Sequence, residues 1–150
     1  MEGGDSRSRT AYNSDRSRAG GGQKQQNGAG MCKQENQLLA RTKKFALRVI
    51  RLVSRLPYGR TEDVIGKQLL RSATSVGANY RASCRARSTK EFISKLGVVE
   101  GEADESVYGL ELLAEAEIVR SELLSDLTRE ANEILSMVVA SIRTAKAKNP

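Results

Sequence analysis

Residues 88–113, STKEFISKLGVVEGEADESVYGLELL, decide the fold of this chain. They open on Ser88, followed three residues later by Glu91, a capping box in which the two side chains bond free amides at a helix start. Apolar or small residues then alternate at spacings of four and three, which places them on one face of an α-helix. These are Phe92, Leu96, Val99, Ala103, Ser106, Leu110 and Leu113. The stretch predicts one long amphipathic helix.

The same alternation appears in two segments before this helix. The first segment is predicted to start at Asn36 as N-cap and to end at Pro57-Tyr58-Gly59. Its apolar face contains Leu38, Thr42, Phe45, Val49, Leu52 and Leu56. The second is predicted to start at Thr61 as N-cap, with Glu62 and Asp63 in its first turn, where the helix dipole favours anions. Its face contains Ile65, Leu69, Ala73, Val76, Tyr80 and Cys84.

A fourth segment follows near the C-terminus, with Leu124, Leu127, Ala131, Ile134 and Val138 on its apolar face. No Gly or Pro marks its start, which we place near residues 119–121. Four amphipathic segments with short connections predict an all-α, antiparallel up-down-up-down four-helix bundle over residues 35–148. Residues 1–34 are predicted to be a disordered basic tail, because the Gly-, Ser- and Arg-rich start has too few apolar side chains to offset its ordering entropy. Met31 is an alternative translation start.

Composition narrows the range of functions. The 150 residues contain no His and no Trp, only 4% aromatics, and a formal net charge of +7. Without His there is no Ser-His or Cys-His nucleophile pair and no imidazole ligand for zinc. Cys32 and Cys84 form no C-x-x-C motif, and no uncharged run approaches the roughly 18 residues that a membrane helix needs. We therefore expect a cytoplasmic protein that is not an enzyme, with no cofactor, no metal and no membrane partner.

Five glycines fall inside the predicted helices, at positions 66, 77, 97, 101 and 109. Each costs about 1 kcal/mol relative to alanine in a helix interior. Two explanations stay open. Some of these glycines allow a neighbouring helix, of this chain or of another subunit, to approach closely, or they are merely tolerated.

Charge is divided unevenly along the chain. Residues 41–95 contain fourteen Lys or Arg and three acids, whereas residues 96–150 contain five Lys or Arg and eleven acids. In the first helix a basic stripe follows its own alternation of three and four, offset from the apolar face, over roughly 20 Å. The basic stripe is Arg41, Lys44, Arg48, Arg51 and Arg55, and a basic corner between the second and third helices is Arg81, Arg85, Arg87 and Lys90.

These nine cations are the candidate nucleic-acid-binding residues, because Lys and Arg neutralise backbone phosphates. The alternative is a solvated face whose charges pair with acids of the third and fourth helices. The acids Glu100, Glu102, Asp104, Glu105, Glu111 and Glu115 are interpreted as a solvated face or as partners for arginines, since di-metal bundles use Glu-x-x-His pairs. Ser75 and Asn79, one turn apart, are predicted to be a buried hydrogen-bonded pair that fixes helix register, and Cys84 to be a small core residue.

Residues 70–113 resemble the four-helix bundle family known as the 23S rRNA-intervening-sequence proteins, and the likeness extends over about residues 36–140. The motifs that carry it are Arg71-Ser72, Ser75-Val76-Gly77-Ala78-Asn79-Tyr80-Arg81, Arg85-x-Arg87-Ser88-x-Lys90-Glu91-Phe92 and Glu102-Ala103-Asp104-Glu105. Many members have Glu-Gly where this chain has Ala82-Ser83. The resemblance implies a bacterial cytoplasmic bundle without catalytic residues. A related accessory protein of diversity-generating retroelements is a pentamer that binds nucleic acid and a reverse transcriptase.

Two functions follow as predictions. The first is a homo-oligomer, for which the resemblance suggests five subunits, that binds RNA or DNA backbone without sequence specificity. The basic first half and acidic second half would then face each other between subunits. The second is an oligomeric adaptor for another protein, for example a nucleic-acid enzyme, with no direct role on nucleic acid.

Overall fold

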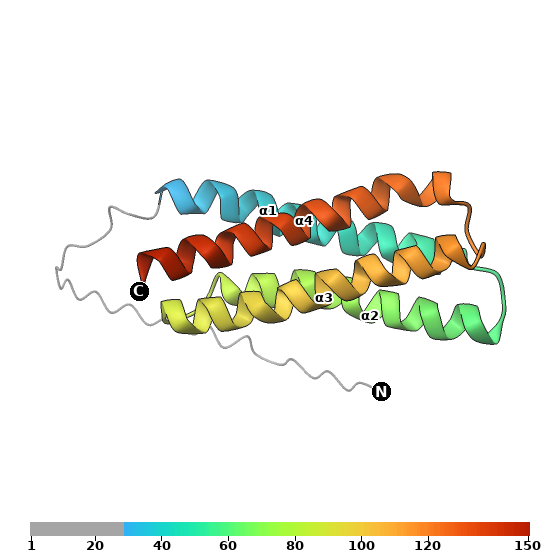
Figure 1. The fold of residues 1–150 in the computed structure, drawn as a ribbon, viewed down its shortest axis with the longest axis horizontal. Coiled ribbons are helices and arrows are strands. Elements are labelled where there is room, and N and C mark those ends of the chain that lie inside the picture. Colours follow the sequence, from blue (N-terminus) through green and yellow to red (C-terminus); the bar gives the residue numbers. More distant parts are fainter. Residues whose placement is uncertain (1–28) are drawn as a thin grey trace, which may run out of the picture.

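The computed structural model describes residues 29–150, with side chains from residue 37 onward. It contains four helices: α1 (Ala29–Val53), α2 (Arg60–Ser83), α3 (Thr89–Glu115) and α4 (Ser121–Lys148). Consecutive helices run in opposite directions, and the four form a long bundle (Figure 1). The predicted all-α four-helix bundle is confirmed. Most of the predicted tail lies outside the described residues, and α1 begins at Ala29, earlier than the expected start at Asn36.

The core lies where the sequence pattern places it. The predicted apolar faces of α3 and α4 are buried apart from Phe92, which is half-buried at the start of α3. In α1 and α2 the centre is buried, whereas Leu52, Leu56 and Ile65, at the end near the α1–α2 connection, are half-buried. Side chains at alternating spacings of three and four pack between helices because such positions repeat on one face.

The helix ends differ in detail from the predictions. The Ser88 hydroxyl accepts from the Glu91 amide at 3.1 Å, as predicted, but the Glu91 carboxylate accepts from the Arg87 amide rather than from that of Ser88. Thr61 is not the N-cap of α2, because the helix begins at Arg60 and Gly59 precedes it without a side-chain cap.

The α3–α4 connection ends α3 in a Schellman motif. The amide of Glu117 donates to the Ala114 carbonyl and that of Ile118 to the Leu113 carbonyl, each at 3.0 Å. Glu117 has a φ of 58°, the left-handed conformation that usually takes Gly. Glu117 thus occupies the position that usually takes Gly, so no glycine marks the boundary between α3 and α4 in the sequence. Residues 116–120 connect the helices, consistent with the predicted position.

Three of the five helical glycines lie against another helix of the same chain. A Cβ on Gly66 would meet Leu56 at 3.1 Å, one on Gly77 would meet the Thr42 carbonyl oxygen at 3.6 Å, and one on Gly109 would meet Leu69 at 3.3 Å. Gly97 and Gly101, on α3, have nothing among the described residues within 4 Å of such a Cβ. Close approach within the chain therefore explains Gly66 and Gly109, Gly77 has room for an ordinary contact, and the other two face away from the bundle.

A buried hydroxyl pair joins α2 to α3. Ser106 lies 2.9 Å from Ser72, oxygen to oxygen, and both are fully buried. Each hydroxyl also bonds a carbonyl of its own helix, Ser72 that of Leu69 and Ser106 that of Glu102. The pair therefore satisfies its polar atoms inside the core.

Candidate nucleic-acid interface

The basic stripe lies along the edge of α1 that faces α4. The contacts of Arg41 show this orientation, because its guanidinium reaches Glu130, Glu133 and the Met137 sulfur on α4. The opposite edge of α1 faces α2, because Thr42 lies against Gly77. Lys44, Arg48 and Arg51 follow Arg41 at helical spacing and therefore continue along the α1–α4 edge, and Arg55 lies in the turn beyond the end of α1 at Val53.

Arg41 is bound within the chain. Its Nε donates to Glu130 Oε1 at 2.9 Å and its Nη2 to Oε2 at 2.8 Å, a two-point contact, and Nη2 also reaches Glu133 at 2.5 Å. The hydrogen bonds that Arg41 donates to Glu130 and Glu133 raise the pKa of Arg41, and the bond from Arg41 lowers the pKa of Glu130. Two carboxylates thus neutralise the first residue of the stripe, as the ion-pair alternative expected.

The other four stripe residues differ from Arg41. Lys44, Arg48, Arg51 and Arg55 form no ion pair with any described residue, and all but half-buried Arg48 are exposed. Lys44 and Arg48 are near enough to Glu130 to lower its pKa further through charge. At 1.5 Å of rise per residue, the three that lie on α1, Lys44 to Arg51, span roughly 10 Å of the helix.

The basic corner belongs to a different surface. Arg81, Arg85, Arg87 and Lys90 are all exposed and form no ion pair with the described part of the chain. They lie around the α2–α3 connection, whereas the stripe runs toward the opposite end of the bundle and ends near the α1–α2 connection (Figure 1). Gly77 of α2 lies against α1, and Arg81 follows it by one turn of α2. Arg81 therefore lies on the side of the bundle where α2 meets α1, whereas the stripe lies where α1 meets α4. The nine candidate cations form two separate surfaces.

Few aromatic rings are available beside these cations. Phe45 and Tyr80 are buried in the core and Phe92 is half-buried. Tyr58, just beyond the C-terminal end of the stripe, is fully exposed. One accessible ring next to Arg55 can stack on a base but cannot read a sequence.

Two of the acids of α3 pair with an arginine that is not among the nine candidate cations. Arg71 on α2 contacts Glu102 at 3.0 Å and Glu105 at 2.6 Å. The hydrogen bonds that Arg71 donates to Glu105 and Glu102 raise the pKa of Arg71. Within the described residues, no group of three or more acids and cysteines is arranged to hold a metal ion. Helical spacing does not predict this contact, because Arg71 lies on α2 and its two partners lie on α3.

Ser75 and Asn79 do not form the buried side-chain pair that the sequence suggested. The Asn79 amide donates to the main-chain carbonyl of Ser75 at 2.9 Å, and both side chains are half-buried. The hydroxyls of Ser72 and Ser106 have that role instead. One turn of helix brings Asn79 within reach of the Ser75 carbonyl more readily than of its short hydroxyl. Cys84 is half-buried and packs against the core.

No helix among residues 29–150 has an apolar stretch long enough to cross a membrane. A sequence profile of the 23S rRNA-intervening sequence proteins matches residues 34–140. A crystal structure from Bacteroides thetaiotaomicron, described as a protein of unknown function from the S23 ribosomal protein family, is similar in fold. It is 34% identical, with a TM-score of 0.69, over 73% of this chain and 98% of that one. Comparison with curated proteins gives no match.

Proposed function

This chain belongs to the 23S rRNA-intervening sequence protein family, and from that premise we propose that it is a non-enzymatic, oligomeric protein that binds nucleic-acid backbone. The observation that carries the proposal is the row Lys44, Arg48, Arg51 and Arg55, none of which forms an ion pair with a described residue. A row of such cations along a helix and the turn after it suits the regular phosphates of RNA or DNA.

The chemistry of the row favours phosphate contact without sequence readout. Three of its four residues are arginines, whose planar guanidinium forms bidentate contacts with phosphate that lysine cannot form. Asn or Gln side chains that could read base edges are absent from positions 41–55. Tyr58 adds one stacking surface at the end of the row. Binding is therefore expected to depend on salt and to vary little with sequence.

Self-association would strengthen this binding. The excess of cations in residues 41–95 and of acids in residues 96–150 supports contacts between unlike surfaces of neighbouring subunits. An assembly repeats the row and raises avidity without any new contact. The family resemblance suggests five subunits, a bacterial cytoplasmic setting, and a nucleic-acid enzyme as a further partner.

The test replaces Arg48, Arg51 and Arg55 together with Gln. Its matched control replaces Arg120, Arg143 and Lys146 with Gln, three exposed cations off the α1–α4 edge that form no ion pair with described residues. Fluorescence anisotropy measures binding to a single-stranded and a duplex RNA of mixed sequence over a range of salt. Light scattering checks the assembly in each case.

We expect the stripe variant to lose roughly tenfold or more in affinity, and the slope of log affinity against log salt to fall by about 2 to 3. The control should stay within about twofold of the parent. Equal binding by parent and stripe variant, with assembly intact, would refute a phosphate-binding stripe.

A second candidate function has its own observation. Leu47 and Ile50 are each 44% exposed on the face of α1 turned away from the bundle. Exposed apolar side chains that lie together on one face mark a candidate protein-binding surface. An adaptor would therefore use this face for a partner protein. Leu47→Ser with Ile50→Ser should abolish partner recovery under this function and leave RNA binding unchanged.

A further inference from the structure

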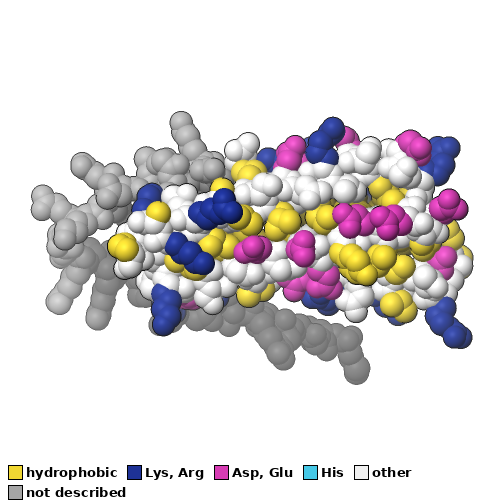
Figure 2. All heavy atoms as spheres, viewed as in Figure 1, with side chains coloured by type: hydrophobic (Ala, Val, Ile, Leu, Met, Phe, Trp, Pro, Cys, Tyr) yellow, Lys and Arg dark blue, Asp and Glu magenta, His cyan; other side chains and the backbone are white. Residues whose placement is uncertain are grey.

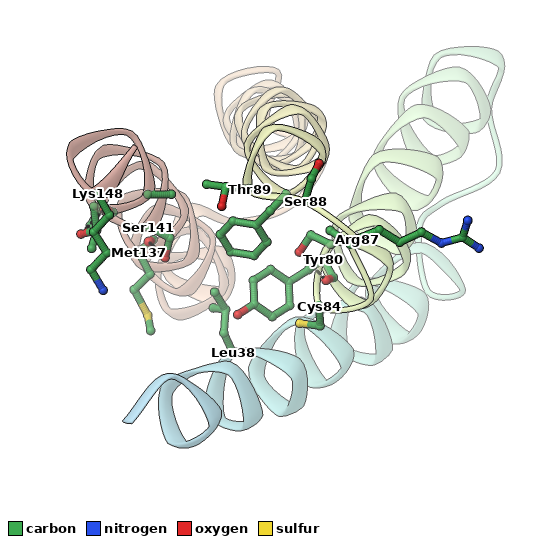
Figure 3. A pocket seen from close by; sticks show the side chains of 15 residues that line it. Leu38, Tyr80, Cys84, Arg87, Ser88, Thr89, Met137, Ser141 and Lys148 are labelled. Carbon is green, nitrogen blue, oxygen red and sulfur yellow. Dashed lines mark hydrogen bonds between the residues drawn. The ribbon is translucent and has the colours of Figure 1, made fainter. Parts of the chain in front are cut away.

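The bundle is hollow at the end where α1 and α3 begin and α2 and α4 end. An open cavity of about 550 Å³ lies between the four helices there. Each helix contributes an apolar side chain: Leu38 from α1, Tyr80 from α2, Phe92 from α3 and Met137 from α4. Figure 3 shows the Tyr80 ring and Leu38 turned toward the space beside α4. We call this space the end cavity.

The sequence of α4 explains why the cavity exists. After Val138 the only further buried residue of α4 among the described residues is Ile142, and the α4 residues beside it that line the cavity include Ser141, Ala145 and Lys148. A packed core needs large apolar residues at such positions. Ser83 on α2 and Thr89 on α3 line the cavity with equally small side chains. Beside Ile142 the core layer is therefore only partly filled at this end of the bundle.

The mouth of the cavity is positively charged. Among the residues whose side chains the structure describes, its lining contains Lys148 and no carboxylate, while the Arg87 side chain, which also lines it, extends away from the space (Figure 3). Figure 2 shows several Lys and Arg side chains at this end of one face, whereas the acidic side chains of that face lie in its middle and at its far end. The hydroxyls of Ser83, Ser141 and Thr144 donate to carbonyls of their own helices, so they offer few donors to a ligand. The cavity thus combines an apolar interior with a cationic group, Lys148, at the rim.

We propose that the end cavity binds a small amphipathic anion, a free carboxylic acid with an aliphatic body. Pockets of 300–1,000 Å³ with apolar walls and a few polar groups are the usual size and character of small-molecule sites, and bundles place them between helices. The aliphatic body would lie against Leu38, Tyr80, Phe92 and Met137, and the carboxylate at the rim near Lys148. The chain's own N-terminal residues 1–28 suit the site poorly, because they are polar and carry more Lys and Arg than acids.

Isothermal titration of the full chain with decanoate tests the ligand class. Decyltrimethylammonium has the same aliphatic body and the opposite charge. We expect decanoate to bind with one site per subunit and at least tenfold more tightly than the cation. Equal affinity for the two probes, or no decanoate binding in the millimolar range, would overturn the proposal.

Two pairs of variants locate the site. Ser141→Leu with Ala145→Leu fills the cavity from two positions that line it, and Ser136→Leu is the control, on the exposed surface of the same helix. The filled variant should lose decanoate binding at least tenfold, and the control should not. Lys148→Glu should weaken binding by about threefold to fivefold, the size of one exposed charge pair, and Lys146→Glu should leave it unchanged.

Binding to the filled variant as tight as to the parent would place decanoate elsewhere and refute the site. Circular dichroism checks folding, and Ala145→Leu alone repeats the test if the double variant is not helical. Vesicles of phosphatidylglycerol separate a free acid from a membrane. If they capture the parent but not the filled variant while decanoate fails to bind, the cavity serves a lipid surface and the proposal is wrong.

Discussion

Arg41 of α1 holds Glu130 of α4 through two hydrogen bonds, at 2.9 and 2.8 Å. Among the described residues, α1 and α4 share the smallest interface of the four neighbouring helix pairs. The first stripe residue therefore closes the most weakly packed side of the bundle, while the following four keep their charges for another partner.

Glu130→Gln should lower the free energy of unfolding at neutral pH by about 1 kcal/mol, since it removes a partly buried two-point ion pair. The pKa of Glu130 is lowered from 4.5 in the folded chain. A depressed carboxylate pKa gives stability that is present above pH 4.5 and is lost as the pH falls through the folded-state value. Denaturant unfolding should therefore show a difference between parent and variant that shrinks below pH 4.5.

The matched control is Glu122→Gln, an exposed acid of α4 with no ion pair among the described residues. It should change stability by less than about 0.5 kcal/mol. A Glu130→Gln effect that is the same at pH 7 and pH 3 would show that the ion pair is not its cause.

Glu117→Gly should raise the free energy of unfolding by about 1 kcal/mol. Glu117 has a φ of 58°, where a side chain is strained and Gly is not. The same replacement at Glu111, exposed inside α3, should lower stability by about 1 kcal/mol. Thermal or urea unfolding of both variants measures these opposite signs, and a loss at both positions would contradict the strained C-cap.

Gly97→Ala and Gly101→Ala should each raise stability by about 0.5 to 1 kcal/mol, because none of the described residues lies within 4 Å of the added methyl group. Gly66→Ala should gain less, since Leu56 and Val53 must move. Unfolding and light scattering are measured together. If light scattering shows that Gly97→Ala or Gly101→Ala dissociates an oligomer, another subunit packs on these glycines. Close approach of that subunit would then explain why they are glycines.

Ser106→Ala should cost about 1 kcal/mol because it leaves the buried Ser72 hydroxyl without its partner at 2.9 Å. The double variant with Ser72→Ala should cost less than the sum of the two single variants. Ser125→Ala, at an exposed serine bonded only within its own helix, is the control and should cost less than 0.5 kcal/mol. Strict additivity in this double-mutant cycle would mean that the two hydroxyls do not interact.

The helices and their buried faces could be predicted from the sequence, because both arise from local geometry. The run from Phe92 to Leu113 defines α3, and Ser88 with Glu91 marks its start. The end of α3 was harder to place, since Glu117 occupies a position where Gly is the usual signal. The candidate cations could be named from the sequence, but those that form ion pairs could not be told from those that do not. A row of Lys and Arg has the same spacing in both cases.

The sequence by itself determined four amphipathic helices, the order in which they pack and one edge of α1 lined with cations. Only the tertiary structure decided which of those cations is neutralised, because Arg41 and Glu130 are 89 positions apart. It also separated the basic corner from the basic stripe, and it left the core only partly filled where small residues of α2, α3 and α4 meet. Periodicity records the face on which a residue lies, whereas pairing and volume depend on what another helix places opposite it.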